Sequence, residues 1–382
     1  MLKIQGKIKQ RQKNMEKQNI KSQKQVLRSL EELKNSDLVN LFEVKISLRN
    51  QKIGVFIINK LVSYLQQCKN VKVISLDLAH NQIELQAAIY LASSLKQLTN
   101  LTSFSLDISE NNLKSDGLCF ILDSLCQSNL EKLKLKLNNT CIEDQVVPVI
   151  TQLFNQKLKK LQIDLGRNKI NGQGICDLVS AFQICVNLEE LSLVLDLDFR
   201  GDLIAKTLGL EIKKLENLKK MQLSLCRFSL DGSFIKDLNP IFEQKTQLKQ
   251  FEINLKTNYL KDEQVIGFFK QLELCKNLES LSINVGYNRL KGNTVECIGS
   301  ILTQLYHLNY LSLNFDENQI NGECVKSFAT SLLQCKQILF ISLVLPVKQI
   351  DLEQAEYLKL KLKKLPKLVQ LNYEVEDYDP CY

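Results

Sequence analysis

The stretches 101–113 (LTSFSLDISENNL) and 278–290 (LESLSINVGYNRL) are two copies of one pattern, and this pattern decides the fold. Written as L-x-x-L-x-L-x-L-x-x-N-x-[IL], it recurs along nearly the whole chain of 382 residues. Successive copies start 30 residues apart, apart from one spacing of 29 and one of 28. The twelve starts are Leu41, Val71, Leu101, Leu130, Leu158, Leu188, Leu218, Leu248, Leu278, Leu308, Ile338 and Leu368. Such a constant register indicates a chain built from one repeated structural unit.

Each copy predicts a strand followed by a helix. In the copy that starts at Leu158, Leu161, Ile163 and Leu165 alternate with other residues, and a period of two is typical of a strand. Further along each unit, as in 294–305 (TVECIGSILTQL), apolar residues recur at the helical spacings of three and four. One unit cannot bury both its strand and its helix, so successive units must stack and share a core.

This stacking predicts the architecture. Helices are wider than strands, about 10 Å against about 4.8 Å between neighbouring strands, so a stack with one on each side must curve. We therefore predict an α/β fold, a right-handed solenoid shaped like a horseshoe, with a parallel concave sheet and convex helices. The twelve starts correspond to about 11–12 repeats.

The residues quoted above resemble the ribonuclease-inhibitor-like branch of the leucine-rich-repeat family, and the resemblance covers about residues 38–375. It implies repeats of similar length with a full helix in each. The usual family pattern, L-x-x-L-x-L-x-x-N-x-L, is two residues shorter than the one here. Interface positions of the family therefore do not transfer to this chain by a simple offset.

The net charge of +8 is concentrated at the N-terminus. Residues 1–25 carry eight Lys or Arg and only Glu16 as an acid, whereas 26–382 hold 42 basic and 41 acidic residues. We predict a basic, disordered tail over 1–25 and a leucine-rich-repeat domain over 26–382. Within this domain we predict a helical cap over 26–40, with the helix itself at about 25–34, and a cap strand over 368–382. A nearly neutral body makes nucleic acid an unlikely partner.

The sequence predicts neither an enzyme nor a cofactor or metal site. It contains no CxxC, GxxxxGK[ST], HExxH or GxSxG motif, and the only histidines, His80 and His307, occupy turn positions of the repeat. An apolar leader and an apolar run of about 18 residues are also missing, so we expect a cytoplasmic protein that does not enter a membrane. In such a compartment the twelve cysteines stay reduced.

Two residue columns have a structural interpretation. Asn at the eleventh position of the pattern is expected to satisfy backbone groups of neighbouring turns that water cannot reach: Asn81, Asn111, Asn168, Asn258, Asn288 and Asn318. Cysteines just before the repeat starts are expected to be small buried apolar groups: Cys68, Cys126, Cys185, Cys275 and Cys335.

Candidate binding residues alternate with the strand leucines and therefore face away from the core. Lys132, Lys134, Lys136 and Lys160 predict a basic patch. Tyr310, Phe340, Val344 and Pro346 predict an apolar and aromatic patch, unless the C-terminal segment covers Phe340 and Val344. Polar residues near the strand ends complete the predicted partner-binding set: Asp164, Asn284 and Asn314.

The irregular stretch 195–230, in which Asp198 and Phe228 replace the repeat Asn, is either a docking loop or tolerated drift in one repeat. The function predicted from all of this is an interaction scaffold or inhibitor-like binder whose concave face binds a protein partner. One alternative is a GTPase regulator, since Ran GTPase-activating proteins resemble the chain in length and number of repeats. Another alternative is a structural component of a cytoskeletal or ciliary assembly, with the tail 1–25 contacting an acidic surface.

Overall fold

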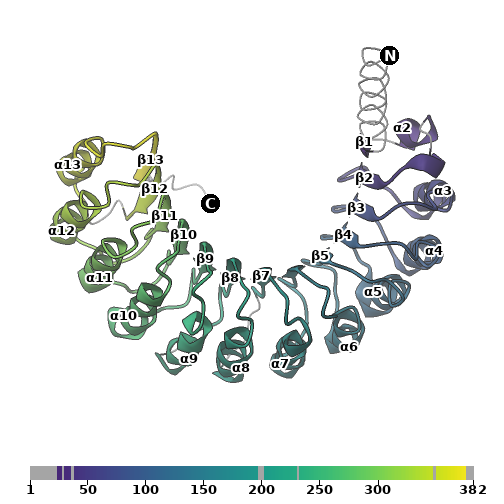
Figure 1. The fold of residues 1–382 in the computed structure, drawn as a ribbon, viewed down its shortest axis with the longest axis horizontal. Helices are drawn as coiled ribbons and strands as arrows, with labels where there is room; N and C mark the ends of the chain where they lie inside the picture. The colour runs from purple at the N-terminus through teal and green to yellow at the C-terminus, as the bar shows by residue number, and fades with distance from the viewer. Residues whose placement is uncertain are drawn as a thin grey trace, which may run out of the picture. The chain divides into compact units, whose positions relative to one another are not determined.

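The computed structural model describes residues 24–27, 30–35, 38–196, 202–229, 232–346 and 350–375. The chain forms two compact units, Met1–Ile163 and Asp164–Tyr382. In each unit the strands are parallel and lie side by side in chain order, with the helices in a second layer against them (Figure 1). The fold is the α/β leucine-rich-repeat solenoid that the repeat pattern predicts. A single domain over 26–382 remains a prediction from the register.

The first unit contains six strands among its described residues, the last of which ends one residue into the second unit. The strands are β1 (Lys24–Leu27), β2 (Glu43–Ser47), β3 (Val73–Asp77), β4 (Ser103–Asp107), β5 (Lys132–Lys136) and β6 (Lys160–Asp164). The helical segments are α2 (Leu30–Lys34), η1 (Leu38–Asn40), α3 (Val55–Leu65), α4 (Leu85–Leu95), α5 (Lys114–Asp123), η2 (Asp144–Val146) and α6 (Val147–Thr151).

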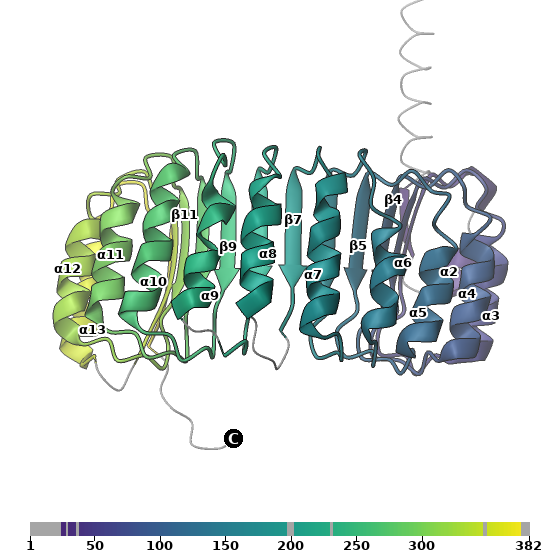
Figure 2. The same cartoon turned by 90° about the horizontal axis from the view of Figure 1, so that it is seen from below.

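The second unit continues the alternation, and Figure 2 shows its helices side by side in front of the strands. Its strands are β7 (Glu190–Val194), β8 (Lys220–Ser224), β9 (Gln250–Asn254), β10 (Ser280–Asn284), β11 (Tyr310–Asn314), β12 (Phe340–Leu345) and β13 (Gln370–Val375). Its helical segments are α7 (Gly172–Ser180), η3 (Ala181–Ile184), α8 (Asp202–Lys213), α9 (Gly232–Asp237), η4 (Asn239–Phe242), α10 (Asp262–Lys270), η5 (Gln271–Leu274), α11 (Gly292–Leu302), α12 (Gly322–Leu332) and α13 (Leu352–Leu362).

The strands pair with corresponding repeat positions opposite one another. Phe104 of β4 is paired with Ile74 on one side and Leu133 on the other, and all three are buried. Because side chains alternate along a strand, this register stacks the leucine positions into one layer facing the helices. The helices complete the core with residues such as Leu118 and Ile121 of α5. The other face of each sheet is left without a covering layer of helices.

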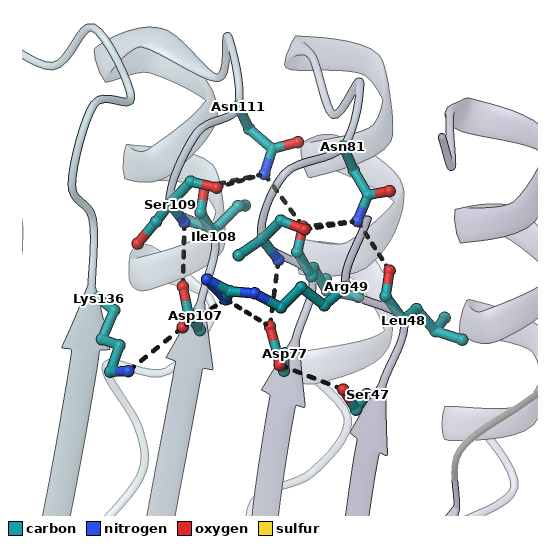
Figure 3. A network of polar contacts seen from close by, with 12 residues as sticks. Ser47, Leu48, Arg49, Asp77, Asn81, Asp107, Ile108, Ser109, Asn111 and Lys136 are labelled. Carbon is teal, nitrogen blue, oxygen red and sulfur yellow. Dashed lines mark hydrogen bonds and ion pairs between the residues drawn. The ribbon is translucent and has the colours of Figure 1, made fainter. Parts of the chain in front are cut away.

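The Asn column has the structural role predicted for it. Asn111, which is 4% exposed, donates from Nδ2 to the carbonyl oxygen of Leu78 in the preceding repeat at 3.0 Å. It also donates to the carbonyls of Ile108 and Ser109 of its own turn, at 2.9 and 3.2 Å. Its Oδ1 accepts from the N–H of Ile83 at 2.9 Å. Asn81 makes matching bonds one repeat earlier, and Figure 3 shows both side chains at the turns. These amides join the backbones of adjacent repeats.

The helical cap predicted at the N-terminal end is partly wrong. Lys24–Leu27, which we assigned partly to the basic tail and partly to a helix, forms β1 and pairs with β2, with Val26 opposite Lys45. The helix begins only at Leu30. An edge strand leaves backbone N–H and C=O groups unpaired, and pairing with β1 satisfies those of β2. The predicted C-terminal cap strand agrees with β13, while residues 1–23 and 376–382 lie outside the described residues.

Candidate protein-binding faces

In each unit the strand faces that point away from the helices carry the candidate site. We call the side chains of β2 to β6 that point away from the core the first strand face, and those of β7 to β13 the second strand face. On the first strand face the middle row aligns Lys45, Ser75, Ser105 and Lys134 on adjacent strands. Serines in the middle of this row leave a low floor between longer basic side chains. Such a floor can accept the side chains of a partner.

A network of charged groups crosses the first strand face near the carboxyl ends of the strands (Figure 3). The Arg49 guanidinium lies 3.5 Å from a carboxylate oxygen of Asp77 and 3.4 Å from one of Asp107. The Lys136 ammonium contacts Asp107 from the other side at 3.5 Å, and the Ser47 hydroxyl donates to Asp77 at 3.2 Å. The network links β2, β3, β4 and β5. Because its basic groups are partly exposed, each ion pair contributes at most about 1 kcal/mol.

The structure places the predicted basic patch on two neighbouring strands. Lys132, Lys134 and Lys136 extend from β5, and Lys160 extends from β6. Lys136 is paired with Asp107, whereas Lys132 and Lys134 form no ion pair within the described part of the chain. Burial lowers the pKa of Lys134, neighbouring Lys136 lowers it further, and Asp107 raises it. This corner of the first strand face therefore holds basic groups that its own acids do not neutralise.

Hydrogen bonds between side chains link β7, β8 and β9 across the second strand face. The Ser192 hydroxyl donates to Oε1 of Gln222 at 2.8 Å, and Nε2 of Gln222 donates to Glu252 at 3.1 Å. In the next row toward the carboxyl ends, Ser224 donates to Asp196 at 2.7 Å and accepts from Asn254 at 3.1 Å. Each bond joins successive repeats. The sequence pattern gave no sign of these pairings, since their members are about 30 residues apart.

The polar strand-end residues have a local role that we did not predict. One side-chain oxygen of Asp164 accepts from the N–H of Gly166 at 3.0 Å, and Asn284 binds the N–H of Gly286 at the same distance. Asn314 accepts from Asp316 at 2.9 Å. An Asp or Asn that caps the backbone two residues onward starts a turn, which is the position where each strand must end. A contact of Asp164, Asn284 or Asn314 with a partner remains a prediction.

The apolar and aromatic patch is smaller than predicted. Tyr310 of β11 is 41% exposed, whereas its neighbours on β12, Phe340 and Val344, are half-buried. Pro346 is buried, so its inclusion in the exposed patch was wrong. The strand β13 pairs along β12, and cover of Phe340 and Val344 by the C-terminal segment stays a prediction, because residues 376–382 lie outside the described residues. Tyr310 is thus the accessible aromatic group at this end of the second strand face.

The cysteine prediction is correct for four members of the column and wrong for one. Cys68, Cys185, Cys275 and Cys335 are buried free thiols, but Cys126 is exposed. Cys126 lies four residues before the start at Leu130, whereas the other four lie three residues before theirs. One residue of offset on a helical turn rotates the side chain by roughly 100°, which takes it out of the core.

The described residues show no candidate metal site. They contain no group of three His, Cys, Asp or Glu side chains that could hold a metal ion, and both His80 and His307 are exposed on turns. No described helix is long and apolar enough to cross a membrane.

The irregular stretch 195–230 has two parts with different outcomes. Asp198 lies outside the described residues, so a docking loop there stays a prediction. Phe228 is fully buried at the Asn position, and its N–H donates to Oδ1 of Asn258 at 2.8 Å. The ring of Phe228 thus fills the core where other repeats place an amide. The backbone N–H of Phe228 is satisfied by the Asn of the following repeat.

Comparisons with known proteins add the following. No protein-family model matches the chain, and no curated protein matches it either. Among solved structures, an internalin from Listeria monocytogenes is 17% identical, with 92% of this chain and 90% of that chain covered and a TM-score of 0.41. The actin-binding site 2 of leiomodin-1 is 14% identical over 50% of this chain and 84% of its own, with a TM-score of 0.31. The tropomodulin C-terminal domain from Caenorhabditis elegans is 11% identical over 51% of this chain and 92% of its own, with a TM-score of 0.29.

Proposed function

We propose that this chain is a protein-binding repeat module and that a protein partner contacts its strand faces. The observation that carries the proposal is the composition of these faces. Hydroxyl, amide and charged side chains, with Tyr310 at one end, extend from consecutive strands that no helix covers. A solenoid of this kind presents an extended surface that suits another macromolecule better than a small substrate.

The first strand face is the better candidate for an acidic partner. Lys132 and Lys134 form no ion pair within the described residues, and their neighbours Ser103 and Ser105 on β4 are short enough to leave them accessible. A carboxylate brought to this corner gains attraction from several ammonium groups, one of which, Lys134, is partly desolvated. Rim charges of this type mainly raise the association rate, and they do so most at low ionic strength.

We also propose that the chain belongs to the ribonuclease-inhibitor-like branch of the repeat family, as the sequence pattern predicts. The lengths of the helical segments support this proposal. Helices α3, α4, α11 and α12 each span 11 residues, three turns in a repeat of about 30. The sheet would then serve as a scaffold that binds another protein.

The test is a comparison of matched variants in an affinity purification from a cell extract, quantified by mass spectrometry. Ser105→Arg places a long charged side chain on the floor of the first strand face, and Ser282→Arg does so on the second. The controls, Ser93→Arg on α4 and Ser300→Arg on α11, put the same residue on exposed helix positions.

A partner that is retained by both controls and lost with one strand-face variant supports the proposal and identifies the unit that binds. Partners retained by all four variants, or lost only with the helix variants, contradict it. Circular dichroism of each variant establishes that the fold is kept.

A further inference from the structure

A cavity in the second unit is the feature that the proposed binding faces do not account for. It has a volume of about 730 Å³ and lies at the turns that follow the strands, not on the strand faces. Figure 2 shows β7 of this unit running toward the lower edge of the view, where its turn begins. Residues lining it belong to four successive repeats: Arg167, Lys169 and Asn171 after β6, Asp196 after β7, Arg227 after β8, and Lys256 after β9.

The cavity wall is strongly basic. Arg167, Lys169, Arg227 and Lys256 supply four cations, and Asp196 is the one carboxylate among the described lining residues. That carboxylate is already engaged, because its Oδ1 accepts from the Ser224 hydroxyl at 2.7 Å and from the N–H of Cys226 at 3.2 Å. Arg167 and Arg227 form no ion pair within the described part of the chain. Two exposed guanidinium groups therefore face the same space, and neither is paired with a described carboxylate.

The backbone holds the two arginines in equivalent places. Arg167 and Arg227 both occupy the tenth position of the repeat and have left-handed φ angles of 54° and 63°. Other repeats carry uncharged or acidic residues there, such as Glu110, Thr257 and Glu317, with similar φ angles. The turn geometry is thus general to the repeat, whereas the basic side chains at this position gather at the cavity. Backbone bonds from Arg167 to Asp196 and from Arg227 to Lys256 fix these turns to their neighbours, at 3.1 and 3.2 Å.

We propose that this cavity binds a small soluble molecule that carries two or more adjacent phosphoryl groups. A cavity of this volume suits a small molecule. Guanidinium groups bind phosphoryl oxygens through paired hydrogen bonds. Adjacent phosphoryl groups also concentrate enough negative charge in a small volume to compensate both guanidinium groups, which a single carboxylate does not. Lys256 is held in place by the ring of Tyr287, 4.6 Å from its Nζ.

The experiment measures binding of sodium tripolyphosphate to the full chain by isothermal titration calorimetry, at two salt concentrations. The test variant is Arg167→Gln/Arg227→Gln. The control variant, Arg289→Gln/Lys291→Gln, removes the same charge from exposed positions of the same unit that do not line the cavity. We expect the test variant to bind at least about tenfold more weakly than the wild type, and the control to change affinity less than about threefold.

Three results would overturn the proposal. The first is a wild-type chain that does not bind tripolyphosphate at millimolar concentration, and the second is equal weakening in both variants, which indicates unspecific attraction. The third is a phosphoserine peptide or a polyglutamate peptide that binds at this cavity as tightly as tripolyphosphate. Since all four exchanged residues are exposed, circular dichroism should show an unchanged fold in both variants.

Discussion

A lysine in the core of the second unit gives the sharpest prediction. Lys245 is 1% exposed and occupies the position three residues before the repeat start, where most other repeats place Cys or Leu. Its ammonium donates to the carbonyl oxygen of Lys213 at 2.9 Å, at the end of α8, and to that of Glu243 at 3.3 Å, after η4. The carbonyl oxygens at the ends of two helical segments stabilise the positive charge, but burial removes most of the water that would hydrate the ammonium group.

Burial is the main reason why the pKa of Lys245 falls to about 8, and nearby Lys213 lowers it further. Glu216, Cys275 and Glu243 act in the opposite direction. In the unfolded chain the pKa returns to about 10.5. Between these two values the unfolded chain binds more protons than the folded chain, so the free energy of unfolding rises with pH. At 1.36 kcal/mol for each pKa unit, Lys245 contributes an increase of about 2–3 kcal/mol between pH 7 and pH 10.

The perturbation is Lys245→Met, which keeps an unbranched side chain one atom shorter and removes the titrating group. Urea unfolding of both chains at pH 7, 8, 9 and 10, followed by circular dichroism, gives the free energy difference at each pH. We expect the free energy of unfolding of the wild type to rise by about 2–3 kcal/mol relative to that of the variant across this range. Buried thiols such as Cys68 and Cys335, whose pKa burial raises to about 11, act with the opposite sign, but both chains contain them and their effect cancels.

The control is Lys276→Met, which removes an exposed ammonium from the following repeat and should leave the pH profile of the wild type unchanged. A difference between wild type and Lys245→Met that stays constant from pH 7 to pH 10 would refute the reasoning. In that case the ammonium would be solvated or compensated in the folded chain, in spite of its burial.

Three further predictions concern the repeat itself. Asn111→Ala leaves three carbonyls and one N–H without their partner, so it should lower the free energy of unfolding by about 2–4 kcal/mol. The control, Asn112→Ala at an exposed position, should change this free energy by less than about 0.5 kcal/mol in the same urea titration. Gly209→Ala should destabilise the chain by more than about 2 kcal/mol, because a Cβ there would overlap the carbonyl oxygen of Asp237. Its control, Gly267→Ala in α10, has open space around it and should stabilise the chain by about 0.5–1 kcal/mol. Equal effects of the two substitutions would contradict the close approach at Gly209. The exposed thiols of Cys126 and Cys141 should react with a thiol reagent in the folded protein. The buried thiols should react only on unfolding, namely Cys68, Cys185, Cys275 and Cys335. Labelling of these four in the folded protein, measured by mass spectrometry, would contradict the core described above.

The sequence by itself determined the repeat, its register and its two layers. Every predicted start is followed two residues later by a strand, as Leu101 is by Ser103 of β4 and Leu278 by Ser280 of β10. This was readable because a period of two and a period of three to four residues are local properties of one chain segment. The Asn column was readable for a similar reason, since a buried amide at a turn must bind backbone groups.

Only the tertiary structure decided which side chains from different repeats meet. Residues 24–27 form a strand because the edge of β2 offers them backbone partners, a reason that lies outside their own sequence. Neither the burial of Lys245 nor its two carbonyl partners were predicted from the sequence. The basic cavity likewise depends on turns about 30 and 60 residues apart. Periodicity fixes the direction of each side chain relative to its own backbone, whereas distances between side chains follow from the stacking of whole repeats.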